Sequence, residues 1–158
     1  MRFAIHGLAV MFVAFGTSMS APAQDRADEK KDGAPLLVAF GASVGGLLFE
    51  AHDKIAACEL AVGKDGVDIK EIETKLAITT NIMKVLINNL EKARDDKLLG
   101  AADRNFVSKA IDTAKLVQEE ANTLRKYIGS KDAKDNASYQ DYRKKADQEI
   151  RVILGIKK

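Results

Sequence analysis

The chain has 158 residues and carries 25 Lys and Arg against 23 Asp and Glu, for a formal net charge of +2. This balance excludes the clustered positive charge that a nucleic-acid-binding groove requires. Cys58 is the one cysteine, so an internal disulfide is excluded as well. Stability must therefore come from packing of the hydrophobic residues, which make up 46% of the chain.

Residues 1–23 are predicted to be a secretory signal peptide. A basic residue near the start precedes an apolar stretch, and the segment ends in the small-residue sequence Ala21-Pro22-Ala23. We expect cleavage before Gln24, with a cut after Ser20 as the second possibility. The alternative is an uncleaved anchor helix, although the apolar stretch is short for a membrane span. An exported protein is expected to be periplasmic if the source is bacterial and secreted otherwise.

Residues 24–34 are charged and lack an apolar period, which predicts a flexible lead-in. The domain expected to follow, residues 35–158, contains three long stretches in which apolar or small residues recur every three or four positions. This spacing keeps one side of an α-helix pointed at partner helices. The three stripes are Leu37, Gly41, Val44, Leu48, Ala51, Ile55, Cys58 and Val62; Ile69, Ile72, Leu76, Thr79, Met83, Leu86, Leu90 and Ala93; and Val107, Ala110, Ala114, Val117, Ala121, Leu124 and Ile128.

Residues with known preferences for helix ends mark the expected boundaries. Pro35 suits the first turn of the first helix, and Gly63 suits its end. Asp68 can cap the second helix, which is expected to run to about Arg94. The third helix is expected to end at Gly129.

A fourth helix is expected near the C-terminus, with Asn136 or Ser138 as its N-cap. Its apolar side comprises Tyr139, Tyr142, Ala146, Ile150, Ile153 and Leu154. Short links between successive helices force antiparallel neighbours. The sequence therefore predicts an all-α fold, an antiparallel up-down-up-down four-helix bundle whose fourth helix is the shortest.

The short fourth helix directs attention to one end of the bundle. The first three helices have about 27 residues each, roughly 40 Å, whereas the fourth has about 19, roughly 30 Å. The far end is therefore expected to lack a fourth wall beside six apolar residues, which form our candidate partner-binding set: Leu36, Leu37, Phe40, Leu98, Leu99 and Phe106. Two outcomes remain open at this stage. The end is either a groove for a partner helix or hydrophobic ligand, or it closes as three helices because Gly41, Gly45 and Gly46 allow close approach.

Residues 33–49 contain no charged residue and raise the question of a membrane span. The run is shorter than the roughly 20 residues that a transmembrane helix needs, and it contains internal glycines. We therefore interpret it as the most buried part of the bundle, with no stable membrane span once the leader is removed.

No catalytic, cofactor or metal motif stands out in the chain. His52 lies beside Glu50 and Asp53, with Glu59 two turns further along the same face. A second helix could complete a metal site there, but a solvated histidine among surface acids is the simpler interpretation. Cys58 lies on the first apolar stripe and is expected to be a small buried side chain.

Two cofactor classes that four-helix bundles often carry lack their sequence motifs. Covalent haem attachment requires Cys-x-x-Cys-His, and a di-iron site requires Glu-x-x-His on two helices; neither motif occurs. We therefore expect no cofactor and no enzymatic activity. The leading hypothesis is a non-enzymatic exported bundle that binds an unknown protein partner. The alternative is a periplasmic carrier or sensor of a small hydrophobic ligand or metal ion. Oligomeric state is left open.

Overall fold

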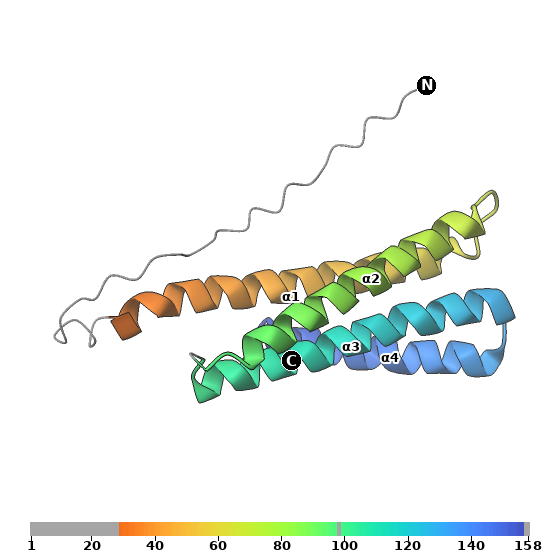
Figure 1. The fold of residues 1–158 in the computed structure, drawn as a ribbon. Helices are drawn as coiled ribbons and strands as arrows, with labels where there is room; N and C mark the ends of the chain where they lie inside the picture. The colour runs from red at the N-terminus through yellow and green to blue at the C-terminus, as the bar shows by residue number, and fades with distance from the viewer. Residues whose placement is uncertain (1–28, 98, 157–158) are drawn as a thin grey trace, which may run out of the picture. The chain divides into compact units, whose positions relative to one another are not determined.

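The computed structural model describes the backbone of residues 29–97 and 99–156 and the side chains of residues 39–97 and 99–156. The predicted signal peptide, residues 1–23, lies outside these ranges. Within them the chain forms no strand and four helices, namely α1 (Glu29–Ala61), α2 (Ile69–Arg94), α3 (Ala101–Ser130) and α4 (Ala133–Ile153) (Figure 1). The predicted all-α fold is confirmed, and α4 is the shortest helix, with 21 residues.

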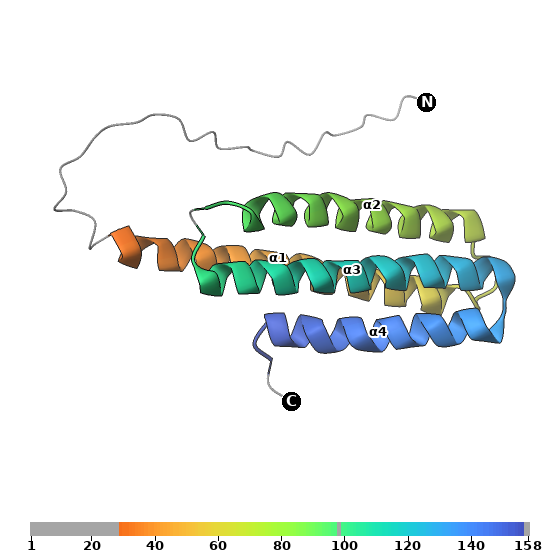
Figure 2. The ribbon, with the colours of Figure 1, turned by 60° about the horizontal axis from the view of Figure 1, so that its bottom comes forward.

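From Pro35 onward the helices pack in one unit, Pro35–Lys158. Consecutive helices run in opposite directions, and in Figure 2 α2 lies above and α4 below, with α1 and α3 between them. The core lies along the middle of this arrangement. Its largest fully buried apolar side chains come from all four helices, and they are Leu48, Ile55, Leu76, Met83, Ile111, Leu124, Tyr139 and Ile150.

The predicted stripes account for most of this core. All seven residues of the third stripe are buried in α3, from Val107 to Ile128. In α2 the prediction differs in the middle of the stripe, because Ile87 is buried whereas the predicted Leu86 is only partly buried, and Ala93 at its end is partly buried too. Ile69, the first residue of that stripe, is exposed. Cys58 is buried in α1, as expected.

The start of α1 differs from the prediction. The helix begins at Glu29 rather than Pro35, so the part of the expected lead-in from Glu29 onward is helical. Good helix formers occupy the first positions of this segment, and Gly33 costs only about 1 kcal/mol relative to alanine. Proline within a helix removes a hydrogen bond without necessarily ending the helix. The preference of proline for the first turn was therefore misleading here.

The second helix begins as predicted. The carboxylate of Asp68 accepts a hydrogen bond from the backbone N–H of Lys70 at 2.9 Å, which makes Asp68 the N-cap. Glu71 forms an ion pair with Lys75, one turn further along the helix, at 2.7 Å. Local sequence was sufficient in this case because cap and ion pair each involve residues within one turn.

The turn between α3 and α4 lies a few residues away from its expected position. Lys131, with φ of 55°, takes the left-handed conformation that was expected at Gly129, and α3 runs to Ser130. Asp132, not Asn136 or Ser138, caps α4 by accepting from the N–H of Lys134 at 2.7 Å. The hydroxyl of Ser130 further accepts from the N–H of Asp132 at 3.1 Å. Asp132 is as good an N-cap as asparagine or serine, and using it gives a fully hydrogen-bonded, shorter turn.

Candidate functional site

An apolar pocket of about 800 Å³ lies at the end of the bundle where α2 ends and α3 begins. All four helices contribute to its walls. The lining residues are Phe40, Gly41, Ala42, Ala93, Leu99, Asp103, Phe106, Val107, Ile153 and Leu154. We call this hollow the end pocket.

The end pocket brings together three of the six residues of the predicted partner-binding set. Phe40, Leu99 and Phe106 all line it, with Phe40 exposed and the other two packed against the core. The side chains of Leu36, Leu37 and Leu98 lie outside the described residues. Residues from α1, from α3 and from the link between α2 and α3 therefore converge on the place that the helix lengths indicated.

The C-terminal end of α4 supplies more of a wall than expected. Ile153 and Leu154 line the end pocket, and a Cβ atom added to Gly45 would lie 2.7 Å from Cδ2 of Leu154. The glycine therefore lets the end of α4 approach α1 closely. Even so, α4 stops short of the level at which α3 begins (Figure 2). The expectation that this end of the bundle lacks a fourth wall is thus wrong at Gly45, where the end of α4 packs on α1. The end pocket lies beyond this contact between Gly45 and Leu154.

Close approach of helices has not closed this end of the bundle. A Cβ atom on Gly41 would lie 3.3 Å from Cζ of Phe106, so the ring of Phe106 packs directly on the α1 backbone. Gly46, in contrast, has no neighbour within 4 Å of such a Cβ atom and contributes nothing to closure. The aromatic ring forms one side of the pocket instead of filling it. Among the described lining residues, Asp103 alone carries a charge, so the end pocket can accept an apolar group.

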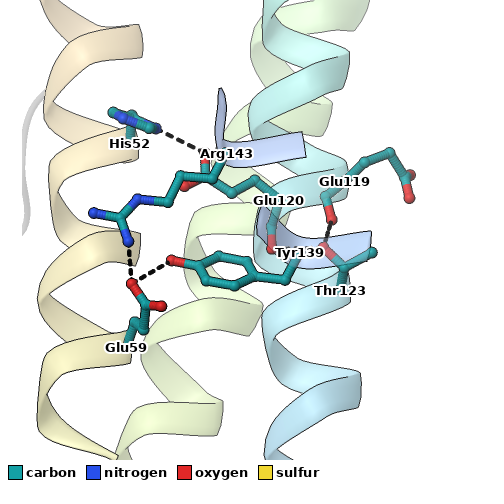
Figure 3. Close-up of polar contacts among 7 residues, drawn as sticks. All are labelled: His52, Glu59, Glu119, Glu120, Thr123, Tyr139 and Arg143. Atoms are coloured by element: carbon teal, nitrogen blue, oxygen red, sulfur yellow. Dashed lines mark hydrogen bonds and ion pairs between the residues drawn. The ribbon is translucent and has the colours of Figure 1, made fainter. Parts of the chain in front are cut away.

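A second feature, which the sequence did not reveal, is a polar cluster inside the bundle (Figure 3). Nδ1 of His52 in α1 lies 2.8 Å from Oε2 of Glu120 in α3. The side chain of Glu120 is 0% exposed and that of His52 only 13%. The interpretation of His52 as a solvated residue is therefore wrong, because its partner comes from another helix and not from the neighbouring Glu50 or Asp53.

Glu59 extends the polar cluster toward α4. It accepts hydrogen bonds from the hydroxyl of Tyr139 at 3.0 Å and from Nε2 of Gln140 at 2.7 Å, and it forms an ion pair with Arg143. In Figure 3 Tyr139 and Arg143 both reach toward Glu59. The residue expected to share a face with His52 thus joins α1 to α4 rather than completing a site with the histidine.

Burial dominates the electrostatics of the polar cluster. It raises the pKa of Glu120, and the hydrogen bond from His52 opposes this effect only in part. Burial also raises the pKa of Tyr139, with a further contribution from the charge of Glu59. Oε1 of Glu120 has no hydrogen-bond partner among the described residues. The cluster therefore joins three helices at a desolvation cost that its contacts offset incompletely.

One signal in the sequence could have identified Glu120. It lies three residues after Val117 and four before Leu124, both on the third apolar stripe. A carboxylate at that spacing points into the core and requires a partner. On α1, His52 lies beside the core-facing stripe, one residue after the buried Ala51.

The described residues contain no group of three or more His, Cys, Asp or Glu side chains placed to hold a metal ion. Glu50 pairs with Lys54 at 2.8 Å instead of approaching His52. The end pocket and the polar cluster are therefore distinct in character, one an apolar hollow and the other an interhelical contact.

In comparisons with known proteins, no family model, no curated protein and no solved structure matches the chain.

Proposed function

We propose that this protein is an exported, non-enzymatic helical bundle that binds a protein partner through the end pocket. The observation that carries the proposal is the apolar hollow of about 800 Å³ between Phe40, Phe106 and the end of α4. Apolar hollows with aromatic walls are where the few energetically dominant side chains of a partner insert. Exposed apolar surface of this kind on a monomer usually marks a contact site.

Phe40 is the expected anchor of this contact. Its ring is exposed at the rim, whereas Phe106 and Leu99 are partly buried behind it. A partner side chain entering the pocket would contact all three and be shielded from water by them. Asp103 at the rim would remain in the polar surround that interfaces generally have.

Export is part of the proposal and depends on the leader-like residues 1–23. Within the described part of the chain, none of the helices combines the length and apolarity needed to cross a membrane. The single cysteine is buried, which is compatible with an oxidising compartment because an exposed thiol would invite intermolecular pairing. The leader thus supports export, and the burial of Cys58 is compatible with an oxidising compartment.

A small hydrophobic ligand is the second candidate occupant. The volume of the end pocket falls in the range of roughly 300–1,000 Å³ typical of ligand sites. A carrier or sensor would enclose an apolar molecule between Phe40 and Leu154. The metal-binding variant of this alternative gains no support from the described side chains, and we do not propose it.

The test compares two charge-introducing substitutions in the exported protein. Phe40→Glu places a carboxylate at the rim of the end pocket, whereas Leu60→Glu makes the same change at a more exposed position of α1 outside it. We expect chemical cross-linking in the exporting cell to capture a partner with the wild type and with Leu60→Glu, but not with Phe40→Glu. Circular dichroism checks that both variants remain helical.

The ligand alternative is separated by a binding assay with a neutral apolar probe, N-phenyl-1-naphthylamine. A ligand-binding pocket should take up the probe and raise the melting temperature of the wild type, because binding to the native state stabilises it. Phe40→Glu should lose both effects. Partner capture that is equal for Phe40→Glu and the wild type would refute binding through the end pocket.

A further inference from the structure

The helix α2 carries a second apolar stripe that faces away from the core. Ile78, Ile82 and Val85 are 52%, 44% and 60% exposed, respectively. The core-facing stripe of the same helix, with Leu76 and Met83, is fully buried. A surface helix of a bundle needs only one apolar stripe, so the second stripe requires its own explanation.

This second stripe borders a groove between α1 and α2. Two adjoining hollows, each of about 430 Å³, share Ile78 and Ile82. Leu47 of α1 and Val85 of α2 border one hollow, and Ala57 of α1 borders the other. Because the hollows share two lining residues, they lie next to each other along α2. We call the two hollows together the α1–α2 groove.

The stripe on α2 is arranged symmetrically about its centre. Its members alternate in steps of four and three, which keeps them on one helix face, and all are exposed: Glu71, Lys75, Ile78, Ile82, Val85, Asn89 and Lys92. The apolar residues lie in the middle and the polar residues flank them. Glu71, which pairs with Lys75 in its own helix, stands at one end of the stripe, and Lys92 stands at the other.

We propose that the α1–α2 groove is the interface of a two-fold symmetric dimer of this chain. A two-fold axis near Ile82 runs the α2 helices of the two copies antiparallel. Ile78 of one copy then faces Val85 of the other, and Glu71 faces Lys92. A parallel arrangement would instead oppose Glu71 to Glu71 and Lys92 to Lys92, and like charges placed across an interface weaken it.

A second copy explains this pattern better than an unrelated partner does. Two-fold interfaces use the same patch twice, so the patch has to be complementary to itself. An apolar centre with opposite charges at its two ends meets that requirement, whereas a different protein would impose no symmetry on the stripe. The net charge of +2 is also too small to oppose association of two copies.

The dimer proposal is independent of the proposed function. The residues that border the α1–α2 groove differ from those that line the end pocket. Dimerisation can therefore fail while partner binding holds, and the reverse is equally possible. The two experiments therefore test different substitutions and share only the control Leu60→Glu.

Sedimentation equilibrium of the exported full-length protein tests the proposal. We expect the wild type to be a dimer that dissociates on dilution. Ile82→Glu and Val85→Glu should each raise the dissociation constant at least about 100-fold, because a carboxylate would be buried without a partner. Leu60→Glu, on an α1 position that borders neither hollow and is 68% exposed, should leave it unchanged.

Two results would overturn this interface. One is a wild-type protein that stays monomeric at every concentration reached. The other is a dimer that resists both Ile82→Glu and Val85→Glu while circular dichroism shows both variants to be folded. Two variants are used because Val85, the more exposed residue, tolerates a charge in the monomer even if Ile82 does not.

Charge reversal tests the antiparallel orientation. Glu71→Lys and Lys92→Glu should each weaken the dimer by roughly 2- to 30-fold, because the two-fold axis makes each substitution remove two exposed ion pairs. The double variant should restore wild-type affinity, since it exchanges the two charges across the axis. Additive weakening in the double variant would overturn the orientation. Glu71 also pairs with Lys75 in its own helix, so helicity is measured for each variant.

Discussion

Nδ1 of His52 in α1 and Oε2 of Glu120 in α3 lie 2.8 Å apart, although 68 residues separate them in the chain. The carboxylate is fully buried, and Oε1, its other oxygen, has no hydrogen-bond partner among the described residues. The bond from His52 is therefore the main contact that offsets the cost of burying Glu120. Four of the five predictions below concern this pair or the packing around α1, and the fifth concerns the buried thiol.

His52→Ala should lower the free energy of unfolding by about 2 kcal/mol or more at pH 7. The substitution leaves the buried carboxyl group of Glu120 without a hydrogen-bond partner in the core, and an unsatisfied buried polar group is destabilising. Urea unfolding followed by circular dichroism measures the loss. The control is Asp53→Ala at the exposed neighbouring position, which should change stability by less than about 0.5 kcal/mol. Equal effects of the two substitutions would contradict the assigned role of the pair.

The double variant His52→Leu, Glu120→Leu should recover most of that loss. Replacing both members of a buried polar pair with apolar residues of similar size is often neutral or stabilising, because no desolvated group remains. The same urea unfolding experiment applies. If the double variant were much less stable than His52→Ala, the His52–Glu120 pair would stabilise the folded protein by more than its desolvation costs.

The pH dependence of stability should depend on Glu120. Burial raises its pKa above the ordinary value of 4.5, and the nearby charge of Glu59 adds to the rise, while His52 and Arg143 oppose it. Its contribution to stability is therefore complete below pH 4.5 and is lost as the pH rises through the folded-state pKa. Relative to wild type, Glu120→Gln should gain stability as the pH rises from 4.5, until Glu120 is fully ionised.

Unfolding free energies of wild type and Glu120→Gln at pH values between 4 and 8 provide this comparison. Taking the difference removes the titration of distant groups that both proteins share. A difference that falls with rising pH would mean that the pKa of Glu120 is lowered in the folded state, contrary to the effect of burial.

Gly45→Ala and Gly46→Ala should differ although they are neighbours on α1. Alanine at Gly46 meets no atom within 4 Å, so we expect about 1 kcal/mol of stabilisation from helix propensity alone. At Gly45 the new Cβ atom would lie 2.7 Å from Leu154 and 3.2 Å from Ile153. Displacing these side chains should cancel the propensity gain or exceed it. Thermal unfolding of the two variants measures this difference. Equal stabilisation by Gly45→Ala and Gly46→Ala would show that α4 does not pack on Gly45.

Cys58 should react slowly with a thiol reagent in the folded protein. Burial raises its pKa above the ordinary value of 9.0, which lowers the thiolate fraction at pH 8, and the side chain is also shielded by its neighbours. The rate of reaction with 5,5′-dithiobis(2-nitrobenzoic acid) should be at least about 10-fold lower in buffer than in denaturing urea. Equal rates in the two conditions would place the thiol at the surface.

The predictions that the structure confirms are mainly those that depend on residues close to each other in the chain. The spacing of the third stripe identified seven buried positions of α3, and Asp68 caps α2 as expected. Glu71 with Lys75 and Asp141 with Lys145 form ion pairs one turn apart. Each of these features is set by helix geometry within about one turn, so no other helix has to be known.

The predicted helix boundaries are wrong where several neighbouring residues suit the same cap or first turn equally well. Asp132 was as plausible a cap as Asn136 or Ser138, and Lys131 takes a left-handed conformation that glycine would adopt more easily. The beginning of α1 is a similar case, because Pro35 fits the first turn but does not compel the helix to start there. Packing of the whole turn selects among such alternatives.

The spacing of apolar residues predicts the helices and most of their buried faces, and the short links predict their antiparallel order. The contact between His52 and Glu120, the packing of the end of α4 on Gly45 beside the end pocket, and the exposed second stripe of α2 are visible only in the folded protein. The physical reason is that helix formation depends on a local period of 3.6 residues. The rotation and offset of one helix against another depend instead on the simultaneous fit of many side chains across the core.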